Sequence, residues 1–210
     1  MSTDLTKEKI ISESINLFMT YGLRSVTMDD IAKHLSMSKK TIYQHFKDKE
    51  EIIIQATNEV FDTENKKMCE IEDGAENAVE QLYMLTVKLR ETIKNTSTTA
   101  LYDMKKYYPR AWEKYKDYKH NVIYNSVIDN LKRGIREGLF RGNINPEILA
   151  QLRIGEIELS FNKEFFPEDE FTLVEIHDQL YEHFTYGILS DEGVKLFETY
   201  KKKNNLNEAI

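Results

Sequence analysis

Residues 25–49, SVTMDDIAKHLSMSKKTIYQHFKDK, predict the fold of the amino-terminal part of this chain. Thr27 occupies the position of a helix N-cap, and Asp29 and Asp30 follow in the first turn, where carboxylates suit the positive end of the helix dipole. A short turn at 36–38 comes next, and its last serine is a second N-cap. Two short helices joined by so tight a turn form a helix-turn-helix.

The second of these helices, predicted from Lys39 to Phe46, has one apolar and one hydrogen-bonding face. Ile42 and Phe46 lie four residues apart and point into the core. The remaining positions are almost all hydrogen-bond donors and include no acid: Lys39, Lys40, Thr41, Tyr43, Gln44 and His45. A helix that lies against phosphates cannot carry carboxylates, because each would repel the nucleic-acid backbone. The pattern therefore predicts double-stranded DNA as a partner.

These residues resemble a known family of bacterial transcriptional regulators, the TetR family. The matching positions are Thr27, Ile31, Ala32, Ser38, Lys39, Thr41, Tyr43, His45, Phe46, Lys49 and Glu50. Two positions depart from the family pattern: Ser36 stands where a turn glycine is usual, and Lys40 where a glycine often opens the recognition helix. The first departure predicts a different or strained turn, and the second places an extra cation at the DNA groove.

The resemblance implies a role in DNA binding for nine residues. Lys39, Lys40, Thr41 and Gln44 are expected closest to base edges, where an amide can read adenine and a lysine guanine. Thr27, Ser38, Tyr43, His45 and Lys49 are expected to hold phosphates and to set the register on a palindromic operator.

Composition predicts an all-α protein. The 210 residues include only 8 glycines and 3 prolines, and no apolar run is long enough to span a membrane. The net charge of −7 belongs to residues 51–210, because residues 1–50 hold eight basic and seven acidic side chains. The polar amino terminus predicts no secretory signal, and the single Cys69 suits a reducing cytoplasm.

We expect two domains with about nine to ten helices in total. Residues 1–48 form a three-helix DNA-binding domain, and residues 49–210 form a helical domain for ligand binding and dimerisation. A helix from about residue 48 to 71 joins them. The polar stretch at 95–99 is a connection, and Pro109 divides a short helix from a longer one.

Aromatic residues concentrate between residues 100 and 138. Tyr108, Trp112, Tyr115 and Tyr118 share one helical face. They form either a packed core or the wall of a cavity for a small apolar or aromatic ligand, since each combines apolar area with a polar atom.

Two predicted helices, about 147–164 and 170–189, carry apolar residues on two faces and so need two neighbours. One neighbour is the core of the chain, and the resemblance implies that the other is a second copy, giving a homodimer with a four-helix interface. The residues predicted at that interface are Leu152, Gly155, Leu159, Leu180, Phe184 and Ile188.

Enzyme motifs, cofactor-binding motifs and metal-ligand spacings are absent from the sequence. His177 and His183, with Glu156 and Glu158 on the preceding helix, are a weak metal candidate, because six residues is a poor spacing for one helical face. The family resemblance implies instead a dimeric repressor that a small molecule releases from DNA. The alternative is a DNA-binding regulator without a small-molecule effector, either constitutive or responsive to a protein partner.

Overall fold

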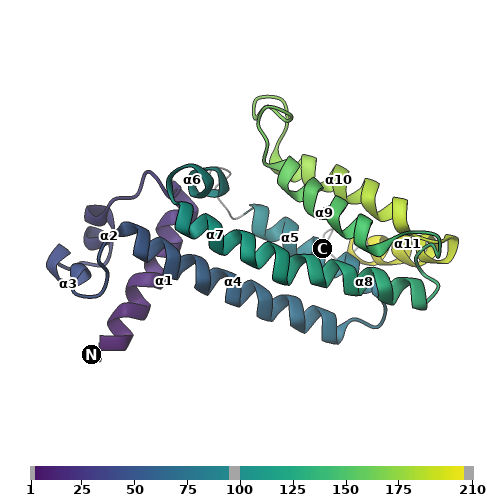
Figure 1. The fold of residues 1–210 in the computed structure, drawn as a ribbon, viewed down its shortest axis with the longest axis horizontal. Helices are drawn as coiled ribbons and strands as arrows, with labels where there is room; N and C mark the ends of the chain where they lie inside the picture. The colour runs from purple at the N-terminus through teal and green to yellow at the C-terminus, as the bar shows by residue number, and fades with distance from the viewer. Residues whose placement is uncertain (1–2, 95–99, 206–210) are drawn as a thin grey trace. The chain divides into compact units, whose positions relative to one another are not determined.

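The computed structural model describes residues 3–94 and 100–205, and the predicted connection at 95–99 lies outside them. The described part of the chain is helical, with one isolated β-bridge between Phe140 and Leu189 and no β-strand (Figure 1). This confirms the all-α prediction. The chain divides into two compact units, one comprising residues 1–65 and 95–118, the other residues 66–94 and 119–210.

The first unit contains the helix-turn-helix. Its helices are α1 (Thr3–Tyr21), α2 (Met28–His34), α3 (Lys39–Tyr43), the first part of α4 (Lys49–Gly74), α6 (Ala100–Tyr107) and α7 (Pro109–Tyr118). Gly22 ends α1 as expected, with φ 82° and its N–H bonded to the Phe18 carbonyl oxygen at 2.9 Å. One hydrophobic core joins α1–α4 to α6 and α7, since Met104, Ala111 and Tyr115 belong to it.

The second unit holds the rest of α4 and the carboxy-terminal helices. These are α5 (Ala78–Lys94), a π-helical turn η1 (Lys119–Ile123), α8 (Tyr124–Arg136), α9 (Pro146–Ser160), α10 (Leu173–Ile188) and α11 (Asp191–Asn205). Asn145 caps α9 by accepting a hydrogen bond from the Ile148 N–H at 2.9 Å, and Thr172 forms a capping box with Glu175 at the start of α10. α9 and α10 lie side by side (Figure 1).

Helix boundaries differ from the predictions by a few residues at several places. α3 ends at Tyr43 rather than Phe46, and the turn that follows it has mixed bonding: the Gln44 N–H bonds the carbonyl oxygens of both Lys40 and Thr41, and the His45 N–H bonds that of Ile42, three residues back. α9 ends at Ser160 rather than near residue 164, and α10 begins at Leu173 rather than near residue 170. α4 continues past its predicted end near residue 71 to Gly74. The predicted domains, residues 1–48 and 49–210, divide the chain by role. They do not coincide with the two compact units, and the division by role stays a prediction.

Candidate nucleic-acid interface

Ser36 is the residue at which α2 turns toward α3. Its φ of 53° lies in the left-handed region, where a side chain is disfavoured and glycine is not. The turn is held by two short backbone bonds, from the Ser36 N–H to Lys33 O at 3.1 Å and from the Met37 N–H to Ala32 O at 2.9 Å. The strain anticipated from the missing glycine is therefore present in the backbone.

Hydroxyl groups cap both short helices. Thr27 accepts a bond from the Asp30 N–H at 3.2 Å, and the Asp30 carboxylate accepts bonds from the Thr27 N–H at 2.8 Å and its hydroxyl at 2.6 Å. The Ser38 hydroxyl accepts from the Thr41 N–H at 3.1 Å and lies 2.8 Å from the Thr41 hydroxyl. Three residues predicted to contact DNA thus also fix the ends of the helices that present the others.

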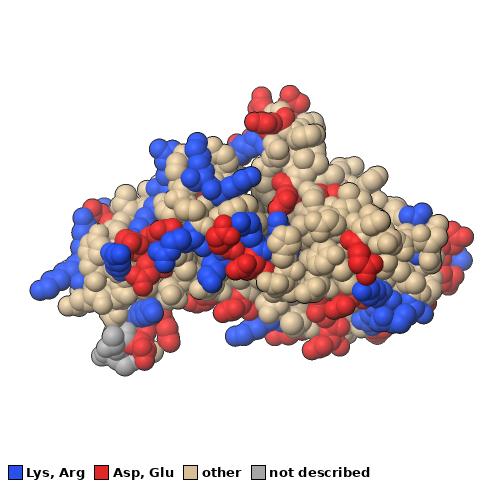
Figure 2. All heavy atoms as spheres, in the orientation of Figure 1, with Lys and Arg blue, Asp and Glu red and all other residues tan. Residues whose placement is uncertain are grey.

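The residues of α3 and the turn that follows it separate into a buried and an exposed face. Ile42 and Phe46 are buried in the core of the first unit, as expected. Lys39, Lys40, Tyr43 and Gln44 are exposed, while Thr41 and His45 are half-buried. Figure 2, in the orientation of Figure 1, shows Lys and Arg atoms projecting from the surface where α2 and α3 lie. These four side chains are accessible at the surface.

Lys39 lies in an ion pair with Asp29 of α2, with 2.6 Å between the ammonium nitrogen and a carboxylate oxygen. The hydrogen bond to Asp29 raises the pKa of Lys39 above its ordinary value. Both side chains are exposed, so the pair contributes little to stability. Lys39 can therefore leave Asp29 for a DNA acceptor at small cost.

The Lys49 side chain is half-buried and makes its contacts within the protein. Its ammonium donates a hydrogen bond to the Arg24 carbonyl oxygen at 3.2 Å and lies 5.5 Å from the centre of the Tyr108 ring. Burial lowers its pKa. Lys49 therefore ties the start of α4 to the loop between α1 and α2, and its predicted phosphate contact stays a prediction.

Helix α6 and Tyr108, the residue that follows it, bind the same loop, a feature that the sequence did not reveal. The buried Asp103 carboxylate accepts the Arg24 N–H at 3.1 Å, and the Tyr108 hydroxyl donates to the Leu23 carbonyl oxygen at 3.3 Å. The Arg24 guanidinium also contacts Tyr107, at 3.3 Å from the phenolic oxygen. We call this set of contacts the loop clasp. No local motif marks these residues, because the partners are 79 to 85 positions apart.

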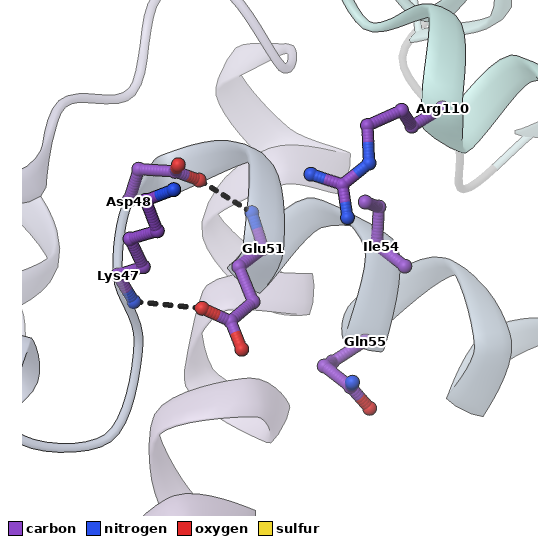
Figure 3. A pocket seen from close by; sticks show the side chains of 6 residues that line it. All are labelled: Lys47, Asp48, Glu51, Ile54, Gln55 and Arg110. Atoms are coloured by element: carbon purple, nitrogen blue, oxygen red, sulfur yellow. Dashed lines mark hydrogen bonds between the residues drawn. The ribbon is translucent and has the colours of Figure 1, made fainter.

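A hollow of about 310 Å³ lies at the start of α4 (Figure 3). It is lined by Lys47, Asp48, Glu51, Ile54, Gln55 and Arg110. Asp48 accepts the Glu51 N–H at 2.9 Å, and the Glu51 carboxylate accepts the Lys47 N–H at 2.7 Å, so the acids here cap the helix. Because the lining carries acidic and basic side chains in equal number, it favours neither an anionic nor a cationic ligand.

The four aromatic residues predicted as a ligand wall lie in the first unit, and three of them, Trp112, Tyr115 and Tyr118, make ring contacts with one another or with Phe61. Trp112 and Tyr115 have ring centres 5.0 Å apart, and Tyr118 stacks on Phe61 at 4.5 Å. Tyr108, Trp112 and Tyr115 pack in or against the core that also supports the helix-turn-helix. These contacts favour the packing interpretation over the cavity wall, and the ligand-binding role stays a prediction.

The residues predicted at a dimer interface divide by exposure. Leu152 is 49% exposed, Gly155 is exposed, and Leu159 and Leu180 are half-buried. Phe184 and Ile188 belong to the core of the second unit and are buried within the protomer. Exposed Ile148, 66% accessible, extends the apolar face of α9. An interface on this face would therefore use the leucines and Gly155. Phe184 and Ile188 instead pack α10 against the core of its own protomer.

Comparisons with known proteins agree with this architecture. A family model described as "Bacterial regulatory proteins, tetR family" matches residues 10–56. The uncharacterized HTH-type transcriptional regulator YvaF of Bacillus subtilis is 25% identical over 189 residues, covering 88% of this chain and 96% of YvaF. IcaR of Staphylococcus aureus, the negative transcriptional regulator of the biofilm operon icaADBC, is 34% identical over 77 residues, 37% of this chain and 41% of IcaR.

Solved structures share the fold. The ketosteroid transcriptional regulator KstR2 of Mycobacterium tuberculosis matches 89% of this chain and 96% of its own with a TM-score of 0.62 and 21% identity. The regulator FadR of Bacillus subtilis, solved in complex with stearoyl-CoA, matches 84% of this chain and 96% of its own, with a TM-score of 0.61 and 18% identity. These relatives are regulators rather than enzymes. The chain belongs to the TetR family of bacterial regulatory proteins and is a helix-turn-helix transcriptional regulator.

Proposed function

We propose that this chain is a dimeric repressor that binds a palindromic operator and is released from it by a small molecule. The observation that carries the DNA-binding half is the acid-free exposed face of α3, because side chains on this face can approach phosphates and base edges without repulsion. Repression is supported by the likeness of a 77-residue stretch of the chain to IcaR, which is described as a negative regulator.

Two copies of α3 would enter successive major grooves, about 34–36 Å apart on one face of the duplex. Gln44 and Lys40 read base edges, since both are exposed on α3 or at its end. Tyr43 and His45 hold phosphates and set the register. Dimerisation follows from the apolar face of α9, where Ile148, Leu152 and Gly155 are exposed.

Release by a ligand is supported by the relatives and by the continuity of α4. FadR was solved with stearoyl-CoA, and KstR2 is described as a ketosteroid regulator. α4 begins beside the helix-turn-helix and runs as one helix from the first unit into the second. A displacement of α4 would reach the loop between α1 and α2 through Lys49, and a coupling of about 1–3 kcal/mol is typical of such regulation. We place the protein in the cytoplasm, where its DNA lies. Within the described residues, none of the helices has the length and apolar character needed to cross a membrane.

The experiment is selection of duplexes from a random library by the purified chain, followed by native mass spectrometry of the selected complex. The proposal expects an inverted repeat and an even number of chains on each duplex. Enrichment of a non-repeated sequence, or one chain bound per duplex, would contradict it. A binding curve that stays flat at low salt for every duplex would remove the DNA-binding role altogether.

A further inference from the structure

Three polar atoms of α10, inside the second unit, have no hydrogen-bond partner among the described residues. They are both ring nitrogens of His177 and the hydroxyl oxygen of Thr185. The His177 side chain is 3% exposed and Thr185 is 0% exposed. Folded proteins pair nearly all such groups, since a buried polar atom without a partner loses its bonds to water and gains nothing in return. These atoms therefore call for an occupant that the described chain does not supply.

The unpaired atoms lie along one face of α10. His177, Tyr181 and Thr185 are spaced by four residues, so they form a row along the helix. The His177 ring lies parallel to the Tyr181 ring, with an interplanar angle of 3° and 6.3 Å between centres. Tyr181 is itself satisfied, because its hydroxyl donates to the Leu82 carbonyl oxygen of α5 at 3.1 Å.

Arginines from two other helices stand beside this row, and each already has an acidic partner. Arg153 of α9 packs against the Tyr181 ring at 5.6 Å and lies 3.3 Å from the Glu156 carboxylate. Arg90 of α5 forms an ion pair with Asp178, with 3.1 Å between its Nε and a carboxylate oxygen, although this Nε has no hydrogen-bond partner among the described residues. The positive and negative charges around the row are therefore balanced.

Charge balance decides the class of ligand. His177 is neutral at pH 7, because burial, and then Arg153 and Arg90, lower its pKa to about 4. A neutral imidazole offers one donor and one acceptor, and the Thr185 hydroxyl offers both. An incoming anion would lose its hydration and find no unpaired cation. An uncharged group that both donates and accepts matches the row.

We propose that the row His177–Tyr181–Thr185 binds the hydroxyl group of a small apolar alcohol or phenol. The apolar part of such a ligand would lie against the neighbouring buried side chains Ile176 and Phe184. This inference rests on the proposed function in one respect: it takes the molecule bound here to be the effector. It also places the site between α5, α9 and α10, away from the Tyr108–Tyr118 wall predicted from the sequence.

The first test measures thermal unfolding with matched pairs of probes. Each pair has the same shape, with a hydroxyl in one member and a methyl group in the other: 4-ethylphenol and 4-ethyltoluene, cyclohexanol and methylcyclohexane, 1-hexanol and heptane. For at least one pair, we expect the hydroxyl member to raise the Tm of the wild-type protein more than the hydrocarbon does. In His177→Phe, which keeps a buried ring, this difference disappears and the affinity for the hydroxyl probe falls at least tenfold.

His183→Phe is the matched control, because His183 is exposed on the same helix. It should keep the wild-type difference between the paired probes. Equal Tm shifts for both members of every pair, or an unchanged difference in His177→Phe, would overturn the proposal.

The second test follows the histidine ring nitrogens by ¹⁵N NMR during titration with whichever hydroxyl probe gives the larger Tm shift. We expect the His177 resonances to move and those of His183 to stay. Unmoved His177 resonances would mean that ordered water alone occupies the row, and they would overturn the proposal. Operator binding, measured in parallel, distinguishes a failure of the ligand site from a failure of the proposed release from DNA. A probe that binds at His177 without weakening DNA binding contradicts the proposed release and leaves the site intact.

Discussion

His177 makes folding depend on pH at the scale of a single residue. In the unfolded chain its imidazole takes up a proton below about pH 6.5, whereas in the folded chain it stays neutral down to about pH 4. The groups that face it are Arg153 on α9 and Arg90 on α5, with Asp178 beside it on α10. Because the unfolded state binds more protons in this window, the free energy of unfolding falls as the pH falls.

We expect the protonation equilibrium of His177 to lower the free energy of unfolding by about 3 kcal/mol between pH 6.5 and pH 4. This figure converts a pKa difference of roughly 2.5 between the unfolded and folded chain at about 1.36 kcal/mol per pKa unit. Urea unfolding of the wild type and of His177→Phe across this range measures the effect as the difference between their slopes. Carboxylates lose stabilising interactions at low pH in both proteins, so only the difference reports on His177. Parallel curves for the two proteins would show that His177 titrates normally.

Ser36 supplies a second test at this scale. A left-handed φ of 53° costs a residue with a side chain about 1–2 kcal/mol. Glycine avoids this cost, but its greater conformational freedom in the unfolded chain cancels part of the gain in stability. Ser36→Gly should therefore raise the free energy of unfolding by about 0.5–1 kcal/mol in urea titrations, and Ser36→Ala should not. A loss of stability in Ser36→Gly would place this residue outside the left-handed region.

At the scale of elements, the loop clasp connects α6 to the helix-turn-helix. Asp103→Ala leaves the Arg24 N–H without its carboxylate, and a lost bond to a charged group costs about 1.5–3 kcal/mol. We expect that loss in the free energy of unfolding, together with weaker operator binding, since the loop leads directly into α2. Asp117→Ala, an exposed acid on the neighbouring α7, should change neither quantity. Unaltered stability in Asp103→Ala would show that the clasp is unimportant.

In these elements, the features that depend on nearby residues were predictable from the sequence, and those that depend on distant residues were not. Caps at Thr27 and Ser38 and the apolar pair Ile42 and Phe46 were predictable, because each acts through neighbours within one helical turn. The loop clasp was not, because its partners lie 79 to 85 positions apart. The burial of the row on α10 was not, because the helices that contact it, α5 and α9, are distant in sequence. The π-helical turn at Lys119–Ile123 has no local signal that we recognise.

At the scale of the whole molecule, association of two chains should depend on the exposed face of α9. Leu152→Glu places a charge on this face without disturbing the core, because Leu152 is 49% exposed. We expect a monomer by analytical ultracentrifugation, with stability changed by less than about 0.5 kcal/mol, as for other surface substitutions. Met84→Glu on α5 is the control, since Met84 is 41% exposed and lies outside the proposed interface. A dimer that survives Leu152→Glu would locate the interface elsewhere.

Base reading by the exposed face of α3 is the central claim for the whole molecule, and one comparison tests it directly. Duplexes are selected from a random library by the wild type, by Gln44→Ala and by Tyr43→Phe, and the enriched sequences are aligned. Gln44 is exposed at the end of α3, so its loss should relax one adenine position in each half-site, at about 1–3 kcal/mol per contact. Tyr43→Phe should weaken all sequences alike and keep the motif. A motif unchanged in Gln44→Ala would contradict the assignment of this side chain to base reading.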